Sequence, residues 1–343
     1  MNKVVTFGEV MMRLSPGSNQ RFRQATSLEV IFGGAESNVV ASLSNWGVPT
    51  AFISRFPENE WGESAVQEIR KMGVDTSHVI QGGNRIGLYF LEKGASIRAS
   101  KIIYDRANSS FSEIEPDMVD WEAVLKDANW FHWTGITVGV SKSAAETCLE
   151  GLKVAKKLGL TISGDPNFRS GLFSYCKEPY VELEEFISLS DLLIANEYDA
   201  SPLFGINFKV KNKHSEIDLQ QFKEFCTRLK DLFPNLAQIA TSKRNAISAS
   251  HNQLTGLLYA SGEVLRTKTY DLMPMVDRVG SGDTFMSGLI YGSLFFEGDR
   301  QKTIDFANAA ACLKHSIPGD VNLASLSEIE KFIEGDTSGR IKR

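Results

Sequence analysis

Short apolar strands and amphipathic helices alternate along most of this chain, and that order is the strongest constraint on its fold. The predicted strands lie at 3–8, 50–55, 130–133, 161–165, 192–195 and 238–241. The predicted helices lie at 39–46, 60–72, 141–158, 181–189 and 219–232. This repeated order predicts an α/β fold with a mostly parallel central sheet and helices on both faces. The ligand site of such a sheet lies beyond the carboxyl ends of its strands.

Two segments interrupt this order and predict a second, smaller β-sheet. Residues 10–31 contain strand-like pieces near 21–23 and 28–32, and residues 87–105 form two strand-like runs around Lys93-Gly94, as in a hairpin. We therefore divide the chain into an α/β core of residues 1–9, 32–86 and 106–343 and a small sheet of residues 10–31 and 87–105. The polar stretch 205–217 is expected to form a surface loop.

Composition limits the partners of the chain. With 343 residues, a net charge of −5 and no sustained Lys/Arg block, it is not expected to bind nucleic acid or an anionic membrane surface. Its four cysteines lie far apart, which fits neither a disulfide framework nor a zinc site. No apolar run reaches membrane-spanning length, and no leader is evident. We expect a soluble, cytoplasmic protein that meets small anionic ligands with local cations.

Near the C-terminus, Gly280-Ser281-Gly282-Asp283 precedes apolar residues at helical spacing. The two glycines predict a tight turn that feeds a helix. Unpaired N–H groups at a helix start attract anions, above all phosphate. Asp283 would repel such an anion unless it removes a proton from the acceptor hydroxyl. From these residues alone, a plain N-cap is an equally good interpretation of Asp283.

Gly33-Gly34 and Asn38 form a similar turn-and-helix pattern near the N-terminus. The glycines permit close approach to the backbone, and the Asn38 amide can both donate and accept hydrogen bonds, as sugar hydroxyls require. Taken alone, the glycine pair is better explained as a structural turn.

Two arginines come at or near the ends of predicted strands. Arg106 lies two residues after Tyr104 and therefore on the same face of a strand, and Arg169 ends the run Asp165-Pro166-Asn167-Phe168-Arg169. The planar guanidinium is the preferred partner of a carboxylate. A solvated strand pair and a turn built on proline are the structural alternatives.

Asn196-Glu197-Tyr198-Asp199 follows the strand at 192–195. Its oxygen atoms could hold Mg²⁺ through water. An acidic first helical turn is an equally good interpretation.

Taken together, the runs Gly33–Asn38 and Asp277–Asp283 resemble the two signatures of the ribokinase-like (PfkB) sugar kinases, and the resemblance covers essentially the whole chain. It implies that the small sheet is a lid over a sugar site. It also implies transfer of the γ-phosphoryl group of ATP to a sugar hydroxyl with Mg²⁺ as cofactor. Because lids in this family often dimerise, we expect a homodimer.

By this likeness Asp283 is the catalytic base, and the N–H groups of Gly280, Ser281 and Gly282 form the anion hole. The residues that it places at the nucleotide are Asn196, Thr241, Lys243, Arg278, Gly280, Gly282, Asn308 and Ala311. It implies that Asn196 and Asp199 organise Mg²⁺.

Within the family, Tyr89, Tyr104-Asp105-Arg106 and the run ending at Arg169 resemble the 2-keto-3-deoxygluconate kinases. This implies phosphorylation of that sugar acid to its 6-phosphate, with Arg106 and Arg169 gripping the carboxylate. The implied substrate-binding residues are Gly33, Gly34, Asn38, Tyr89, Tyr104, Arg106, Ile136, Arg169 and Asp283.

Three features depart from the family pattern. Arg278 stands where the second signature usually has a small residue, and Asp199 is one methylene shorter than the usual acid. The nucleotide loop expected at 241–246 lacks the usual Gly-x-x-Gly.

Several alternatives stay open. The chain could be a fructokinase or a ribokinase of the same family, or a non-catalytic sugar-binding protein, although the intact 280–283 run argues against the last. A monovalent-cation requirement is undetermined. A nicotinamide-dependent oxidoreductase is disfavoured because no Gly-x-Gly-x-x-Gly follows the first strand.

Overall fold

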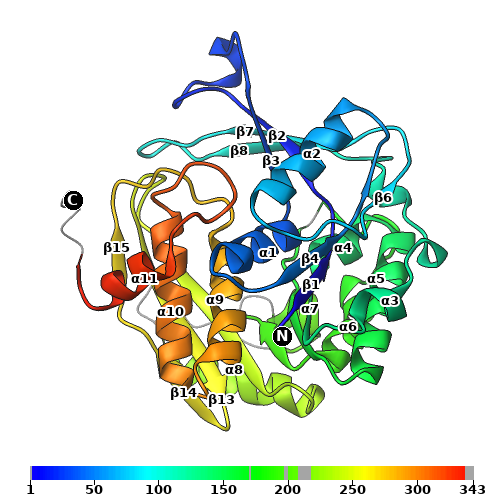
Figure 1. Cartoon of the computed structure of the whole chain (residues 1–343). Coiled ribbons are helices and arrows are strands. Elements are labelled where there is room, and N and C mark those ends of the chain that lie inside the picture. The colour runs from blue at the N-terminus through cyan, green and yellow to red at the C-terminus, as the bar shows by residue number, and fades with distance from the viewer. Residues whose placement is uncertain (1, 170, 197–199, 208–217, 337–343) are drawn as a thin grey trace.

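A large twisted sheet forms the centre of the molecule (Figure 1). The computed structural model describes residues 2–169, 171–196, 200–207 and 218–336, so Asp199 and most of the predicted 205–217 loop lie outside the described residues. In spatial order the strands are β14 (Glu263–Arg266), β13 (Asn252–Ala260), β12 (Gln238–Ala246), β11 (Leu192–Ile194), β10 (Thr161–Asp165), β9 (Trp130–Thr134), β1 (Val4–Phe7) and β4 (Thr50–Ile53), and β15 (Tyr270–Leu272) pairs with β13. The strands from β12 to β4 are mutually parallel, and β13 runs antiparallel to β12.

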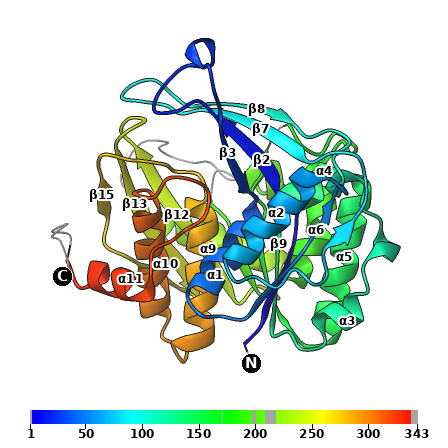
Figure 2. The same ribbon diagram turned by 45° about the horizontal axis from the view of Figure 1, so that its top comes forward.

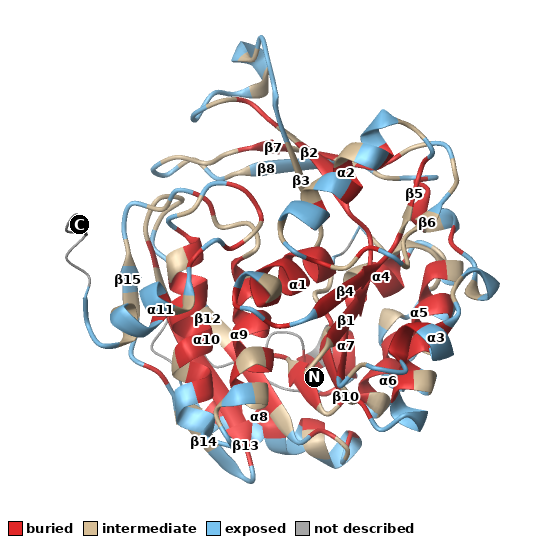
Figure 3. Ribbon diagram, in the orientation of Figure 1, coloured by how far each residue is buried: buried red, intermediate tan, exposed pale blue. Residues whose placement is uncertain are grey.

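Helices cover both faces of this sheet. One layer contains α1 (Ala35–Asn45), α9 (Ser281–Phe295), α10 (Arg300–Lys314) and α11 (Leu326–Ile333). The other contains α3 (Trp121–Leu125), α4 (Gly135–Val140), α5 (Lys142–Lys157), α6 (Pro179–Leu189), α7 (Ala200–Phe204) and α8 (Leu219–Leu232). Successive residues of a strand pack against opposite helix layers. Trp130 packs against the layer that contains α9, and Phe131 packs against the layer that contains α5. The strands are therefore buried on both sides, as Figure 3 shows.

The smaller sheet lies across one edge of the core (Figures 1 and 2). Its strand order is β3 (Glu29–Gly33), β2 (Met11–Ser15), β7 (Gly87–Glu92) and β8 (Lys101–Asp105). The β7–β8 hairpin is antiparallel as predicted, but β2 pairs with β7 in parallel. Helix α2 (Glu60–Lys71) and the short pair β5 (Arg55–Phe56) and β6 (Ile80–Gln81) lie between this sheet and the core.

The predicted fold class is confirmed, and the local errors have physical causes. Residues 22–24 form a short 3₁₀ helix, η1, rather than a strand. Residues 241–246, expected as a loop, continue β12 because each of them pairs with a residue of β13. The antiparallel strands β13 to β15 and the helix α4 were not predicted. Among the described residues, no helix is both long and apolar enough to cross a bilayer.

Candidate active site

Helix α9 begins at the carboxyl edge of the sheet with an exposed row of backbone N–H groups. Its N-cap, Gly280, has a φ of 80°, and a Cβ there would lie 1.8 Å from the carbonyl oxygen of Asp320. Only glycine satisfies both constraints. A Cβ at Gly282 would meet nothing within 4 Å, so the side of the turn at Gly282 faces open space. The predicted turn and helix are confirmed, and the geometry suits an anion.

Asp283 lies in the first turn of α9 and is not the N-cap, so the plain capping interpretation is wrong. Asn38 Nδ2 donates a hydrogen bond of 2.7 Å to Asp283 Oδ2. Burial raises the pKa of Asp283 to about 7, and the carboxylates of Asp165, Glu36 and Asp320 add to this effect, whereas the Asn38 hydrogen bond opposes it. A carboxylate with such a pKa can accept a proton near neutral pH.

The first signature packs against the second. Gly34 is the N-cap of α1, and a Cβ there would lie 2.0 Å from the carbonyl oxygen of Glu9. A Cβ at Gly33 would lie 2.4 Å from the Asp320 carboxylate. Gly33 and Gly34 therefore let the segments at Glu9 and Asp320 approach the start of α1 closely. Asn38 lies one turn further along α1, and its Oδ1 is buried and has no partner among the described residues. That oxygen is available to a ligand hydroxyl.

A second buried acid, Glu36, lies on α1 behind Asp283. The hydroxyls of Thr134 and Thr137 both donate to Glu36 Oε1 at 2.6 Å. Burial raises the pKa of Glu36 to about 7, although these two hydrogen bonds oppose the change. Sequence reasoning did not single out Glu36, even though it stands inside the first signature.

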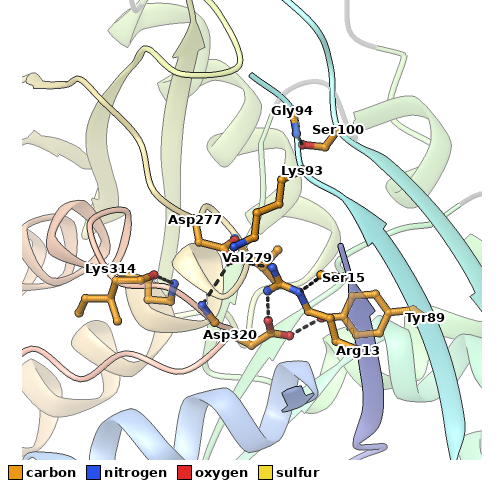
Figure 4. A network of polar contacts seen from close by, with 12 residues as sticks. Arg13, Ser15, Tyr89, Lys93, Gly94, Ser100, Asp277, Val279, Lys314 and Asp320 are labelled. Atoms are coloured by element: carbon orange, nitrogen blue, oxygen red, sulfur yellow. Dashed lines mark hydrogen bonds and ion pairs between the residues drawn. The ribbon is translucent and has the colours of Figure 1, made fainter. Parts of the chain in front are cut away.

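An ion network ties the lid to the core (Figure 4). Arg13 of β2 is fully buried and donates to Asp277 Oδ2 at 2.7 Å and to Asp320 Oδ1 at 2.5 Å. Lys93, just after β7, lies 3.4 Å from Asp277 Oδ2, and the Tyr89 hydroxyl donates to Asp320. Three lid side chains thus neutralise or bind two core carboxylates that flank the anion hole.

Charge states in this network follow from the pairing. Burial alone would lower the pKa of Arg13, but Asp320 and Asp277 raise it above its usual value. Burial alone would raise the pKa of Asp277, but Arg13 holds it below its usual value. Burial, then Asp320, raises the pKa of Tyr89, so its hydroxyl remains a donor. The Tyr89 hydroxyl is therefore bound to Asp320, and the buried ring packs with Met11 and Leu91.

The other predicted sugar contacts occupy different positions. Tyr104 is opposite Tyr89 across β7 and β8, with ring centroids 6.1 Å apart. Arg106 follows β8 rather than lying on it and donates to Glu9. Ile136 is half-buried in the first turn of α4, where its N–H donates to Thr134.

The two predicted carboxylate-binding arginines have different described neighbours. Arg169 is exposed after β10 and is close enough to Arg244 to lower the pKa of that residue, whereas Arg106 is bound to Glu9.

The predicted nucleotide residues are divided between the surface and the core. Thr241 is buried in β12, and burial lowers the pKa of the half-buried Lys243 to about 8. Asn308 and Ala311 are buried in α10, where Asn308 Nδ2 donates to Thr267 Oγ1 at 2.9 Å. Asn196 lies two residues beyond the carboxyl end of β11.

Arg278 and Arg244 lie by the anion hole. Arg278 is two residues before the N-cap of α9 and half-buried. Arg244, which sequence reasoning had not assigned, donates from Nη2 to Ser281 Oγ at 3.0 Å. Because 241–246 is a strand, side chains alternate there and Arg244 points away from the side of Lys243.

Comparison with known proteins agrees with this architecture. Residues 1–325 match the family model described as pfkB family carbohydrate kinase. The chain is 40% identical to 2-dehydro-3-deoxygluconokinase from Thermotoga maritima, whose crystal structure matches it with a TM-score of 0.90 over 97% of this chain and 98% of that chain. A PfkB family carbohydrate kinase from Listeria grayi is 34% identical, with a TM-score of 0.90 over 97% and 100% of the two chains.

A 2-dehydro-3-deoxygalactonokinase from Haloferax volcanii is 30% identical over 98% of each chain. With the two signature turns joined around Asp283 in one α/β core, these similarities identify the class of enzyme. The chain belongs to the pfkB family of carbohydrate kinases.

Replacing Arg13 tests whether the ion network holds lid and core together. Arg13→Gln leaves two buried carboxylates without their partner, and we expect a loss of about 3–5 kcal/mol in the free energy of unfolding. The pKa of Asp277 is depressed in the folded state. The difference in unfolding free energy between variant and wild type should therefore have its full size above about pH 4, and it should shrink as the pH falls further and Asp277 becomes protonated. Urea unfolding followed by tryptophan fluorescence at several pH values measures it.

Arg85→Gln is the matched control, because Arg85 pairs with Asp105 at 2.8 Å in a more exposed position. It should change stability little. If Arg13→Gln is no more destabilising than Arg85→Gln, the network does not hold the lid.

Proposed function

We propose that this carbohydrate kinase transfers the γ-phosphoryl group of ATP to the 6-hydroxyl of 2-keto-3-deoxygluconate. The observation that carries the proposal is Asp283: an acid with a pKa raised to about 7 lies one residue after the open turn of an anion-binding helix. The names of the relatives support a 2-keto-3-deoxy sugar acid as substrate.

In the proposed reaction Asp283 takes the proton of the attacking hydroxyl. Asn38 holds one carboxylate oxygen of Asp283, which orients the other toward the substrate, and Asn38 Oδ1 accepts from a sugar hydroxyl. The N–H groups of residues 280–282 meet the negative charge on the transferring group. Phosphoryl transfer needs little more than such positioning and charge stabilisation.

Mg²⁺ is proposed to arrive with ATP and to neutralise charge on its phosphates. Asn196, two residues after β11, is one proposed ligand, and Asp199, the other, lies outside the described residues. Among the described residues, no group of three His, Cys, Asp or Glu side chains could hold a metal ion. A cation held mainly by nucleotide oxygens and water is consistent with this donor set.

Arg106 is proposed to bind the sugar carboxylate. Its guanidinium is bound to Glu9, but its Nε is buried and has no partner among the described residues. A carboxylate would supply the missing acceptor. Arg169 is the second proposed contact.

Asp283→Asn tests the base. It should lower kcat by about 10²–10⁴-fold with little change in sugar affinity, because only proton transfer is lost. In the wild type, kcat/KM should fall about tenfold for each pH unit below 7, since Asp283 must be ionised to act. Stopped-time ADP-release assays across pH 5.5–8.5, a range chosen about the expected pKa, measure both.

Glu36→Gln provides an internal check. It removes a negative charge that raises the pKa of Asp283, so the acidic limb should move to lower pH. An Asp283→Asn enzyme that keeps most of its kcat would exclude Asp283 as the base.

A sugar panel tests the substrate. We expect ADP release with 2-keto-3-deoxygluconate to exceed that with 2-keto-3-deoxygalactonate, fructose and ribose. Arg106→Ala and Arg169→Ala should raise KM for the acid sugar about tenfold or more, because each removes a charge-assisted hydrogen bond. Equal effects on an acid and a neutral sugar would refute the carboxylate role.

The same assay separates the remaining alternatives. Preference for fructose or ribose would identify a neutral-sugar kinase, and sugar binding without ATP turnover would indicate a binding protein. Replacing KCl by tetramethylammonium chloride at equal ionic strength tests for a monovalent-cation requirement.

A homodimer through the lid is also proposed. Four apolar residues face one another in one row across the four lid strands: Val30, Leu14, Phe90 and Ile103. Their row lies on the opposite face from Arg13 and Tyr89, because successive strand residues alternate. Val30 and Ile103 are 45% and 56% exposed, an apolar surface that a second lid would cover.

Ile103→Lys tests this interface. It should convert a dimer to a monomer in size-exclusion chromatography with light scattering, because it places a charge in the apolar row. Leu232→Lys on α8 is the control, since Leu232 is equally exposed at 56%. A wild-type monomer, or dimers in both variants, would contradict the proposal.

A further inference from the structure

Three arginines from distant parts of the chain gather beside the start of α9. Arg169 follows β10, Arg244 lies on β12, and Arg278 precedes the N-cap of α9. Although the Arg244 residue as a whole is exposed, loss of water around its guanidinium, then repulsion from Arg278 and Arg169, lowers its pKa to about 10. Arg278 and Arg169 are therefore each close enough to repel Arg244.

No described carboxylate forms an ion pair with any of these three arginines. The nearby acid Asp277 is already bound to Arg13 and Lys93. His315, which also lies near Arg244 and Arg278, is neutral because burial and then Arg244 lower its pKa to about 4. Arg169 and Arg244 donate to neutral oxygens of Phe168 and Ser281, and none of the three has a described carboxylate to balance its charge. A ligand with several negative charges would relieve the repulsion at Arg244.

Arg244 is aimed at the anion hole. Its Nη2 donates to Ser281 Oγ at 3.0 Å, and Ser281 is the first residue of α9. The strand at 241–246 is held in register by β13, so the Arg244 backbone is fixed by pairing with Leu254. The hydrogen bond to Ser281 holds one end of the guanidinium beside the first turn of α9, where Gly282 leaves open space for a ligand.

We infer that Arg244 is a further catalytic residue of this kinase: its guanidinium binds the terminal phosphates of ATP and stabilises the transferring group. The inference rests on the proposed function. In that step the sugar oxygen forms a bond to the γ-phosphorus and the bond from this phosphorus to the β–γ bridging oxygen breaks. ADP leaves with the electron pair, and Asp283 takes the hydroxyl proton. Arg244 meets the charge that gathers on the departing and transferring oxygens.

Arg244→Gln tests the inference through the number of phosphates on the ligand. Calorimetric Kd values are measured for the β,γ-imido analogue of ATP with Mg²⁺ and for adenosine. The analogue should bind about 10–100-fold more weakly, because a charge-assisted phosphate contact is lost, while adenosine is unchanged. With ATP and sugar, kcat should fall about 10²-fold or more and KM for the sugar should stay within about twofold.

Arg300→Gln is the matched control. Arg300 also donates one hydrogen bond to a serine hydroxyl at 3.0 Å, to Ser261, but it lies at the start of α10. It should leave both Kd values and kcat unchanged. Arg244→Lys keeps the charge but loses the planar fork, and should retain part of the analogue affinity. If circular dichroism shows that Arg244→Gln does not fold, the Kd values of Arg244→Lys for the analogue and for adenosine are compared with those of the wild type instead.

Other outcomes overturn the inference. Equal weakening of adenosine and the analogue would mean that Arg244 only supports the strand. A raised KM for the sugar acid with unchanged analogue binding would mean that the cluster holds the sugar carboxylate. An active wild type with an unaffected Arg244→Gln variant would refute the inference alone, whereas a wild type without sugar-dependent ADP release would refute the proposed function as well.

Discussion

The site depends on one buried guanidinium. Arg13 lies in the lid strand β2, yet both of its partners, Asp277 and Asp320, belong to the core near the C-terminus. A charge without solvent must be paired, so folding cannot bury Arg13 unless lid and core meet in this one arrangement. Since Asp277 also accepts the N–H of Val279, the same interaction sets the path of the chain into the anion-hole turn.

This pairing divides the acids of the site into two kinds. Asp277 and Asp320 face lid donors, and the pKa of Asp277 is lowered. Asp283 and Glu36 receive hydrogen bonds and form no ion pair with a described cation, and burial raises the pKa of each to about 7, although Arg106 opposes the rise at Glu36. The positive charges of the smaller sheet are thus paired with Asp277 and Asp320, and the pKa of Asp283, the proposed base, stays high. A lid cation placed on Asp283 would lower its pKa and weaken it as a base.

Features coded by neighbouring residues were predictable, and features coded by distant pairs were not. Glycines 280 and 282, followed by helical periodicity, indicated the start of α9 because turn chemistry is local. The bond from Arg13 to Asp320 joins residues 307 positions apart, and no pattern at either residue indicates it. The spacing of Tyr104 and Arg106 predicted that both side chains lie on one face of a strand. Because β8 ends at Asp105, Arg106 lies beyond the strand and the alternation of side chains does not extend to it. Strand ends are set by pairing with a neighbour, which a single segment does not reveal.

The missing Gly-x-x-Gly at 241–246 was visible in the sequence, and the structure gives it a physical meaning. Glycine loops bind phosphate through backbone N–H groups, which requires that those groups be unpaired. Here residues 241 to 246 run antiparallel to β13, so the N–H groups of every second residue are committed to the sheet. Fewer backbone N–H groups are left for an anion than in an open loop, and side chains add positive charge at this edge. Arg244, in the segment that lacks the glycine motif, and Arg278, which replaces a small residue of the second signature, both carry such charge beside the start of α9.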